Sequence, residues 1–266
     1  MATAKDIELK PISSKDANAL VKRVHYSGKV VQNSQLHIGV FLHGQLEGAM
    51  QFGPSLDKRK IQGLVSGTLW HEFIELNRMA FSDRLPRNSE SRALSIAMKL
   101  IKKHAPQVKW VVTFADGTQC GDGTIYRAAG FVLTGIKESK NDLWRLPDHL
   151  AYLSKGEPVV HRITIQCKTS SISHWVVNKY KTHNTPLVTL CDENGGELNN
   201  GFQLRYIYFI DPSYRARLTV PELPYSEIER RGARMYKGQK CASEVTPGDT
   251  TNDQLVEGGS RPTRTL

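Results

Sequence analysis

The topology is specified by Tyr126-Arg127-Ala128-Ala129-Gly130-Phe131, which lies behind the apolar run Trp110-Val111-Val112-Thr113-Phe114. The apolar run predicts a buried strand that ends at Asp116-Gly117. Residues 124–129 predict a short helix, and residues 131–133 begin another strand. The Gly-Phe pair is also typical of an ordinary helix C-terminus, with glycine left-handed and an apolar residue packed behind it. A strand, a helix and a strand in succession indicate an α/β protein.

The preceding residues continue this alternation of strands and helices. Residues 11–27 follow helical spacing behind a serine N-cap. Residues 36–42 and 45–52 predict a hairpin, and residues 70–81 predict a further strand. A helix with one apolar face follows from about residue 89 to residue 104. We therefore expect a mixed central sheet flanked by helices.

The pattern changes near residue 150, which suggests a domain boundary. Residues 1–150 are expected to form the catalytic core, and residues 151–245 a basic, β-containing extension packed on that core. Within the extension, residues 162–166 and 205–210 have a strand-like composition. Residues 246–266 contain few apolar residues and are expected to form a disordered tail.

The overall charge favours a polyanionic partner. The net charge is +10 over 266 residues, and nucleic acid is the commonest polyanion that such a protein binds. A generally basic surface without such a partner is the alternative. The four cysteines form no CxxC pair, so neither a disulfide framework nor a four-cysteine zinc site is expected. No run of eighteen apolar residues is present, which predicts a soluble intracellular protein without a membrane partner.

Two family resemblances follow from the motifs. The Tyr-x-x-x-Gly-Phe element of residues 126–131 resembles a signature of the GCN5-related N-acetyltransferase fold. That fold holds coenzyme A by a glycine-rich loop at a helix N-terminus. The corresponding residues 87–92 contain no glycine, which weakens the expectation of coenzyme A. The closer resemblance is to the Mom family of phage DNA-modification proteins, and it rests on residues 25–27, 75–79, 86–91, 114–116, 125–127, 206–209 and 232–238.

The Mom resemblance implies a function and a setting. The implied product is adenine in DNA with a carbamoylmethyl group on its exocyclic amine, which shields phage DNA from restriction. Adenine in a duplex has to be flipped out of the stack to be modified by a cleft enzyme. The implied partner is therefore double-stranded DNA, in the cytoplasm of a bacterial host. A homodimer is an open alternative to a monomer.

The same resemblance places His25, Tyr26, Arg78, Asp116 and Tyr126 around one cleft. Arg78 would hold a carboxyl or phosphate oxygen, and Asp116 would accept the proton of the adenine amine or hold the edge of the base. Tyr126 would protonate a leaving group or stack on a base, and Tyr26 would stack on the flipped adenine or hydrogen-bond to it. His25 would act as a base or a metal ligand. The structural alternatives are a salt bridge for Arg78, a turn for Asp116 and ordinary packing for the tyrosines.

Two further groups of residues are expected to bind ligands. The start of the second long helix would hold an anion of the cofactor through Arg87, Asn88, Ser89 and Ser91. Phosphates of nucleic acid would be bound by a basic group in the last third of the chain, namely Arg205, Arg215, Arg217, Arg230, Arg231, Arg234 and Lys237.

The identity of the donor is inferred from the product. A carbamoylmethyl group has the atoms of one glycyl unit, whereas an acetyl group supplies no nitrogen. Glycyl-tRNA is therefore the favoured donor, and tRNA a further partner; acetyl-coenzyme A with a metal ion such as iron is the alternative. Two other functions stay open: a conventional N-acetyltransferase, and a nucleic-acid-binding module without activity.

Overall fold

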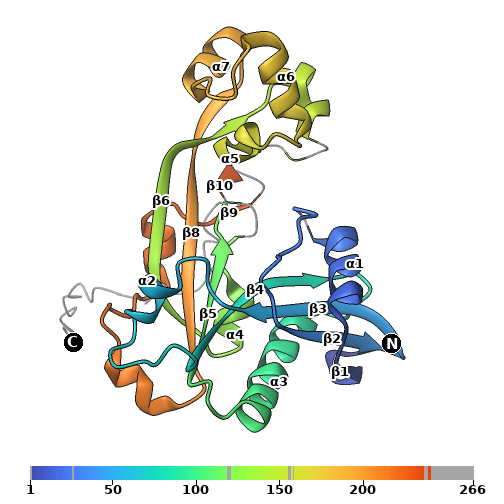
Figure 1. The fold of residues 1–266 in the computed structure, drawn as a ribbon, viewed down its shortest axis with the longest axis vertical. Helices are drawn as coiled ribbons and strands as arrows, with labels where there is room; N and C mark the ends of the chain where they lie inside the picture. The colour runs from blue at the N-terminus through green and yellow to red at the C-terminus, as the bar shows by residue number, and fades with distance from the viewer. Residues whose placement is uncertain are drawn as a thin grey trace, which may run out of the picture.

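One mixed sheet forms the body of the molecule (Figure 1). The computed structural model describes residues 2–25, 27–118, 121–154, 157, 159–236 and 239–240. Within this part of the chain, the sheet has eight strands in the order β1-β2-β3-β4-β5-β8-β6-β7. Their bounds are β1 Ile7–Pro11, β2 Leu36–Leu42, β3 Gln45–Gly53, β4 Phe73–Phe81, β5 Trp110–Asp116, β6 Val132–Arg145, β7 Val159–His161 and β8 Glu197–Phe209.

Helices flank this sheet, so the expected fold class is confirmed. The helices are α1 Ser14–Val24, α2 Lys58–Gln62, α3 Ser89–His104, α4 Thr124–Ala128, α5 Arg162–Gln166, α6 Ser171–Tyr180, α7 Leu187–Asn194 and α8 Ser226–Arg230. Short 3-10 helices span Ala4–Asp6, Asp148–Ser154 and Pro212–Arg217, and β9 Met235–Tyr236 pairs with β10 Gln239–Lys240. No helix in the described ranges is long and apolar enough to cross a bilayer.

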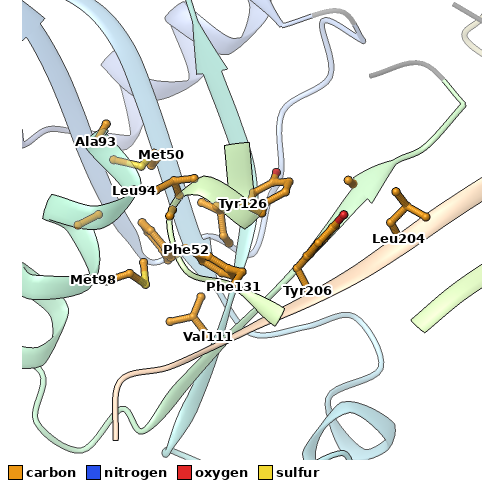
Figure 2. Packing of buried hydrophobic residues seen from close by; sticks show 14 of the residues in the cluster. Met50, Phe52, Ala93, Leu94, Met98, Val111, Tyr126, Phe131, Leu204 and Tyr206 are labelled. Atoms are coloured by element: carbon orange, nitrogen blue, oxygen red, sulfur yellow. The ribbon is translucent and has the colours of Figure 1, made fainter. Parts of the chain in front are cut away.

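The two faces of the sheet have separate cores. On one face, α3 and α4 bury the largest cluster against β3, β5 and β8. Figure 2 shows Leu94 of α3 and Phe52 of β3 in this cluster. On the other face, α1 covers Ala49 of β3. Farther along that face, the rings of Phe73 and Trp110 stack with centroids 4.6 Å apart.

The two longest strands carry a separate helical unit. β6 and β8 run past the other strands, and α5, α6 and α7 lie at their far end (Figure 1). We call residues 146–196 the helical unit. Its core is distinct from those of the sheet faces and also includes Trp144 of β6. The indole of Trp144 is fully buried and donates its N–H to the carbonyl of Gly195, at 3.1 Å.

This arrangement corrects two expectations about the C-terminal half. β8 is not part of an extension packed on a finished core, because it lies between β5 and β6 inside the main sheet. Residues 162–166 form α5 and not a strand. The Ile-Thr-Ile alternation is overridden because the His161 side chain accepts the backbone N–H of Ile163 and caps a helix there. The expected disordered tail, residues 246–266, lies outside the described residues.

The central strands β4 and β5 are paired only near their N-terminal ends and then separate. They are parallel and are paired only from Phe73 with Trp110 to Leu76 with Thr113. Beyond that point, β4 follows β3 and β5 follows β8. The two strands diverge in Figure 1. This opening places the last residues of β4 and β5 on opposite sides of a V-shaped gap in the sheet.

Candidate active site

Arg78 reaches the V-shaped opening because of a bulge in β4. Gln51 pairs with Arg78, but the next residue of β3, Phe52, pairs with Leu76. Asn77 is therefore the extra residue, and bulges of this kind redirect the side chains beside them. Leu76 packs in the α3-side core. Arg78 instead lies beside Gln51, whose side chain donates to Asn18 of α1, so Arg78 faces α1.

His25 ends α1 and contacts Arg78. The imidazole Nε2 lies 3.5 Å from Nη1 of Arg78. The other ring nitrogen, Nδ1, accepts the backbone N–H of Ser27 at 3.1 Å. A neutral ring whose Nδ1 accepts has its proton on Nε2. Nε2 and Nη1 are then both donors, and both could donate to one acceptor oxygen.

Burial keeps this histidine uncharged at neutral pH. Desolvation, with a smaller contribution from the Arg78 cation, lowers the pKa of His25 to about 4. Nε of Arg78 is also buried and has no hydrogen-bond partner among the described residues. The pair therefore presents an uncharged N–H and a guanidinium, a combination suited to a carbonyl oxygen that gains negative charge.

Asp116 lies on the opposite side of the opening, at the end of β5. By the alternation of β5, its side chain is on the sheet face where Trp110 and Val112 are buried. Its Oδ1 accepts the backbone N–H of Thr118 at 3.0 Å. Asp116 thus forms a turn, as its structural alternative predicts. The same turn holds the carboxylate beside the V-shaped opening.

Tyr126 lies on the other face of the sheet. Its ring is buried, 5.7 Å from the Phe131 ring and 5.4 Å from the Tyr206 ring (Figure 2). α4 starts after Gly123, which has a φ of +71°, and a Cβ there would lie 2.7 Å from the Tyr206 ring. The ring of Tyr126 therefore packs in the core, as its structural alternative predicts. Tyr26 lies outside the described residues.

All four residues expected to bind a cofactor line one cavity. The cavity has a volume of about 360 Å³ and lies between α3 and α4; its lining includes Arg87, Asn88, Ser89 and Ser91. Asn88 has a φ of +69° and no side chain caps α3. The hydroxyl of Ser89 is buried and has no partner within the described residues. The unsatisfied N–H groups of the helix start and this hydroxyl suit an anion.

An acidic side chain also lines this cavity. Burial raises the pKa of the Glu90 carboxyl group, which favours its uncharged form. A charged Glu90 would weaken the binding of an anion here, and a protonated Glu90 would not.

Most arginines of the expected basic group in the C-terminal third have partners within the fold. Arg205 is half-buried and is bonded to Thr134. Arg217 packs on the ring of Tyr214. The other described arginines pair with carboxylates: Arg215 with Glu222, Arg230 and Arg231 with Glu227, and Arg234 with Glu229 and Asp122. Lys237 lies outside the described residues.

Several residues near the site had no clear signal in the sequence. Gln51 is fully buried within a strand. Its position as a polar residue between Met50 and Phe52 was the only signal for it in the sequence. Glu157 and His161 of the helical unit both interact electrostatically with Asp116. In the part of the chain that the structure describes, no group of three or more His, Cys, Asp or Glu side chains could hold a metal ion.

Three solved acetyltransferases resemble the chain weakly in structure. The ribosomal-protein-S18-alanine N-acetyltransferase of Escherichia coli is 10% identical, with a TM-score of 0.40, over 77% of this chain and 94% of that one. An acetyltransferase of Bacillus subtilis, in complex with CoA, is 11% identical with a TM-score of 0.37, over 75% and 95%. A GNAT-family acetyltransferase of Streptococcus pneumoniae is 16% identical with a TM-score of 0.36, over 50% and 88%.

Sequence comparison assigns the family. The methylcarbamoylase Mom of Escherichia phage Mu is 41% identical over 137 residues, which are 51% of this chain and 56% of that protein. The matched part thus spans little more than half of that relative. The model of the Mom protein family matches residues 6–227, which include both sides of the V-shaped opening. The chain therefore belongs to the Mom protein family.

Proposed function

We propose that this protein modifies adenine in phage DNA and leaves a carbamoylmethyl group on the exocyclic amine. Membership of the Mom family and the similarity to a methylcarbamoylase support the type of product. The observation that carries the proposal is the pair of donors, His25 Nε2 and Arg78 Nη1, that converge at the open end of the sheet. The modification would shield the DNA from restriction enzymes of the host.

The donor pair would stabilise the oxygen of an acyl group. A carbonyl that is attacked by an amine becomes an oxyanion, and two preorganised donors stabilise it more than they stabilise the ground state. An uncharged His25 is a donor in this arrangement, because its Nδ1 lone pair is occupied by the N–H of Ser27. His25 therefore acts as a hydrogen-bond donor in our proposal, and not as the base or metal ligand that the sequence suggested.

Asp116 would accept the proton of the adenine amine. A carboxylate is a suitable general base for an amine that becomes acidic as it attacks. Asp116 ends β5, and Arg78 lies in the part of β4 that has separated from β5, so that a flipped base would enter between them from outside the stack. Tyr126 would then act indirectly, since its ring packs with Tyr206 beneath the site.

A glycyl donor accounts for every atom of the product. In the first step the adenine amine attacks the glycyl carbonyl, the ester bond to the carrier breaks, and N6-glycyladenine forms. In the second step the free glycyl amine attacks the purine carbon that bears the amide. The original carbon–nitrogen bond breaks, and its nitrogen leaves as the primary amide. The product is an isomer of the first intermediate, so no oxidant is needed.

Glycyl-tRNA is the donor that this route favours. The cavity at the start of α3 suits an anion, such as a phosphate in the backbone of an RNA end, and the net charge of +10 suits a polyanionic carrier as well as DNA. Acetyl-coenzyme A is the rival donor, and it would need a separate source of nitrogen.

The experiment is a purified reaction with duplex DNA, tRNA, glycine ligase and glycine labelled with both ¹³C and ¹⁵N. We expect modified adenine that carries both labels and depends on tRNA. Acetylated adenine formed with acetyl-coenzyme A would instead support a conventional acetyltransferase. Binding of the duplex without any modified nucleoside would support a binding module, and either result would overturn the proposal.

A further inference from the structure

Exposed apolar side chains gather in one segment, between β3 and β4. Among the described residues, six large apolar side chains are exposed, and three of them lie within residues 56–70. Leu56 is 98% exposed, Leu69 55% and Trp70 53%. A cluster of this kind marks a surface that contacts another molecule. We call residues 54–60 and 69–73 the α2 surface, because α2 begins within it.

A cavity of about 900 Å³ hollows the α2 surface, and its lining includes Leu56, Lys58 and Trp70. The ammonium of Lys58 lies 4.5 Å from the centroid of the Trp70 ring and 5.4 Å from that of Phe73. These cation–π contacts hold the indole in place, while about half of it stays exposed. The α2 surface therefore presents a fixed aromatic ring beside a hollow.

The α2 surface is also cationic. Lys58, Arg59 and Lys60 follow one another in α2, and no carboxylate in the part of the chain that the structure describes forms an ion pair with them. Asp57 accepts the backbone N–H of Lys60 at 3.3 Å. In contrast, most arginines of the C-terminal third have partners. Cations beside exposed apolar side chains fit a nucleic acid, because they bind its phosphates.

The position of the α2 surface relates it to the V-shaped opening. Ile61 of α2 packs with Trp110 of β5, on the face of the sheet where α1 also lies, and α1 and α2 lie on either side of β5 in Figure 1. The cavity wall also contacts β4, since the Pro54 carbonyl accepts the side-chain N–H of Asn77 at 3.4 Å. Asn77 is the bulge residue beside Arg78. A molecule bound to the α2 surface would therefore lie next to the opening.

We propose that the α2 surface binds the DNA duplex that carries the target adenine. This inference rests on the proposed function, in which a flipped adenine enters the V-shaped opening. Arg59 and Lys60 would contact phosphates of the strand. Leu56 and Trp70 would contact the bases beside the flipped adenine, as apolar side chains do in proteins that distort a duplex. The phosphate contacts expected of the C-terminal arginines would thus come from α2.

The test measures the affinity for an unmodified DNA duplex at several salt concentrations, without any donor. Arg59→Gln combined with Lys60→Gln should weaken binding about tenfold at low salt and reduce the slope of log affinity against log salt by roughly two. The matched control is Arg230→Gln combined with Arg231→Gln, which removes the same charge from residues paired with Glu227. We expect the control to bind DNA within about twofold of the parent. Equal weakening in both double variants would show a general effect of charge and overturn the inference.

A second pair of variants tests the apolar contacts. Leu56→Ala combined with Trp70→Ala should weaken binding about tenfold at low and at high salt alike, because apolar contacts release no counterions. Tyr152→Ala, at an aromatic residue that is 69% exposed in the helical unit, serves as its control and should bind as the parent does.

Two results would overturn the inference: unchanged affinity for DNA in the variants of the α2 surface, or a loss of affinity for tRNA alone. These measurements need no chemistry, so they separate the inference from the proposed function. If the α2 surface binds DNA as expected but the parent leaves the DNA unmodified, only the proposed function fails. If the parent modifies DNA and both double variants bind it normally, only this inference fails.

Discussion

Replacement of His25 should remove part of the acid sensitivity of the fold. The pKa of His25 is about 4 in the folded protein, compared with an ordinary value of 6.5. Between these values the unfolded chain binds a proton at this position and the folded protein does not. The free energy of unfolding therefore falls as the pH drops below about 6.5, and the loss is complete below about 4.

The size of this effect follows from the two pKa values. Between about pH 7 and about pH 5, the linkage amounts to about 2 kcal/mol. His25→Gln keeps a polar side chain but cannot titrate. The free energy of unfolding of the parent should thus fall by about 2 kcal/mol more than that of the variant over this range. His37 and His161, whose pKa values burial also lowers, affect parent and variant equally.

Urea unfolding at the two pH values measures this difference directly. His25→Asn serves as a second, independent replacement, so that the result does not depend on how glutamine packs. If the parent and both variants lose the same free energy on acidification, His25 is not held neutral by the fold. In that case its Nε2 cannot be the uncharged donor that the mechanism requires.

Three other outcomes are expected. Ser89→Ala should leave the free energy of unfolding within about 1 kcal/mol of the parent, because the buried hydroxyl has no partner to lose among the described residues. The same change should raise KM for the donor. An unchanged KM would show that Ser89 is not part of the donor site. Tyr206→Phe should lower the free energy of unfolding by about 1–2 kcal/mol in urea, because the Tyr206 hydroxyl donates to the backbone carbonyl of Asp122; full stability would show that this bond contributes nothing. Binding to duplex DNA should weaken steeply as salt increases, and an affinity that does not change with salt would argue against phosphate contacts.

Local patterns in the sequence predicted most of the N-terminal half. The hairpin of β2 and β3, the strands β4 and β5 and the helices α1, α3 and α4 all form within a few residues of their expected bounds. Alternation and capping residues act over short distances, so these elements can be inferred without knowledge of the rest of the chain.

Long-range pairing could not be inferred in this way. β8 lies between β5 and β6 because it pairs with both. The local sequence of residues 197–209 does not indicate which strands β8 will pair with. For the same reason the arginines of the last third looked like free cations. Their partners, such as Glu222 for Arg215, become visible only when the chain is folded.

Site residues that are neighbours in the sequence could be grouped from the sequence, but contacts between distant residues could not. The four residues expected at the start of α3 do line one cavity, because they are neighbours in sequence. The contact of His25 with Arg78 joins residues far apart in the chain, and it depends on the bulge at Asn77. The roles of His25, Arg78 and Asp116 in catalysis stay predictions.

The most decisive measurement is the nucleoside composition of plasmid DNA from bacteria that express the parent, Arg78→Gln or Arg231→Gln. Arg231 is a matched control, because its guanidinium is paired with Glu227 at the surface. We predict carbamoylmethyladenine in DNA from the parent and from Arg231→Gln, and at least a hundredfold less from a folded Arg78→Gln, about the effect of removing one oxyanion donor. Equal amounts of modified adenine in all three DNAs would contradict the assignment of Arg78, and unmodified DNA from the parent would contradict the proposed function.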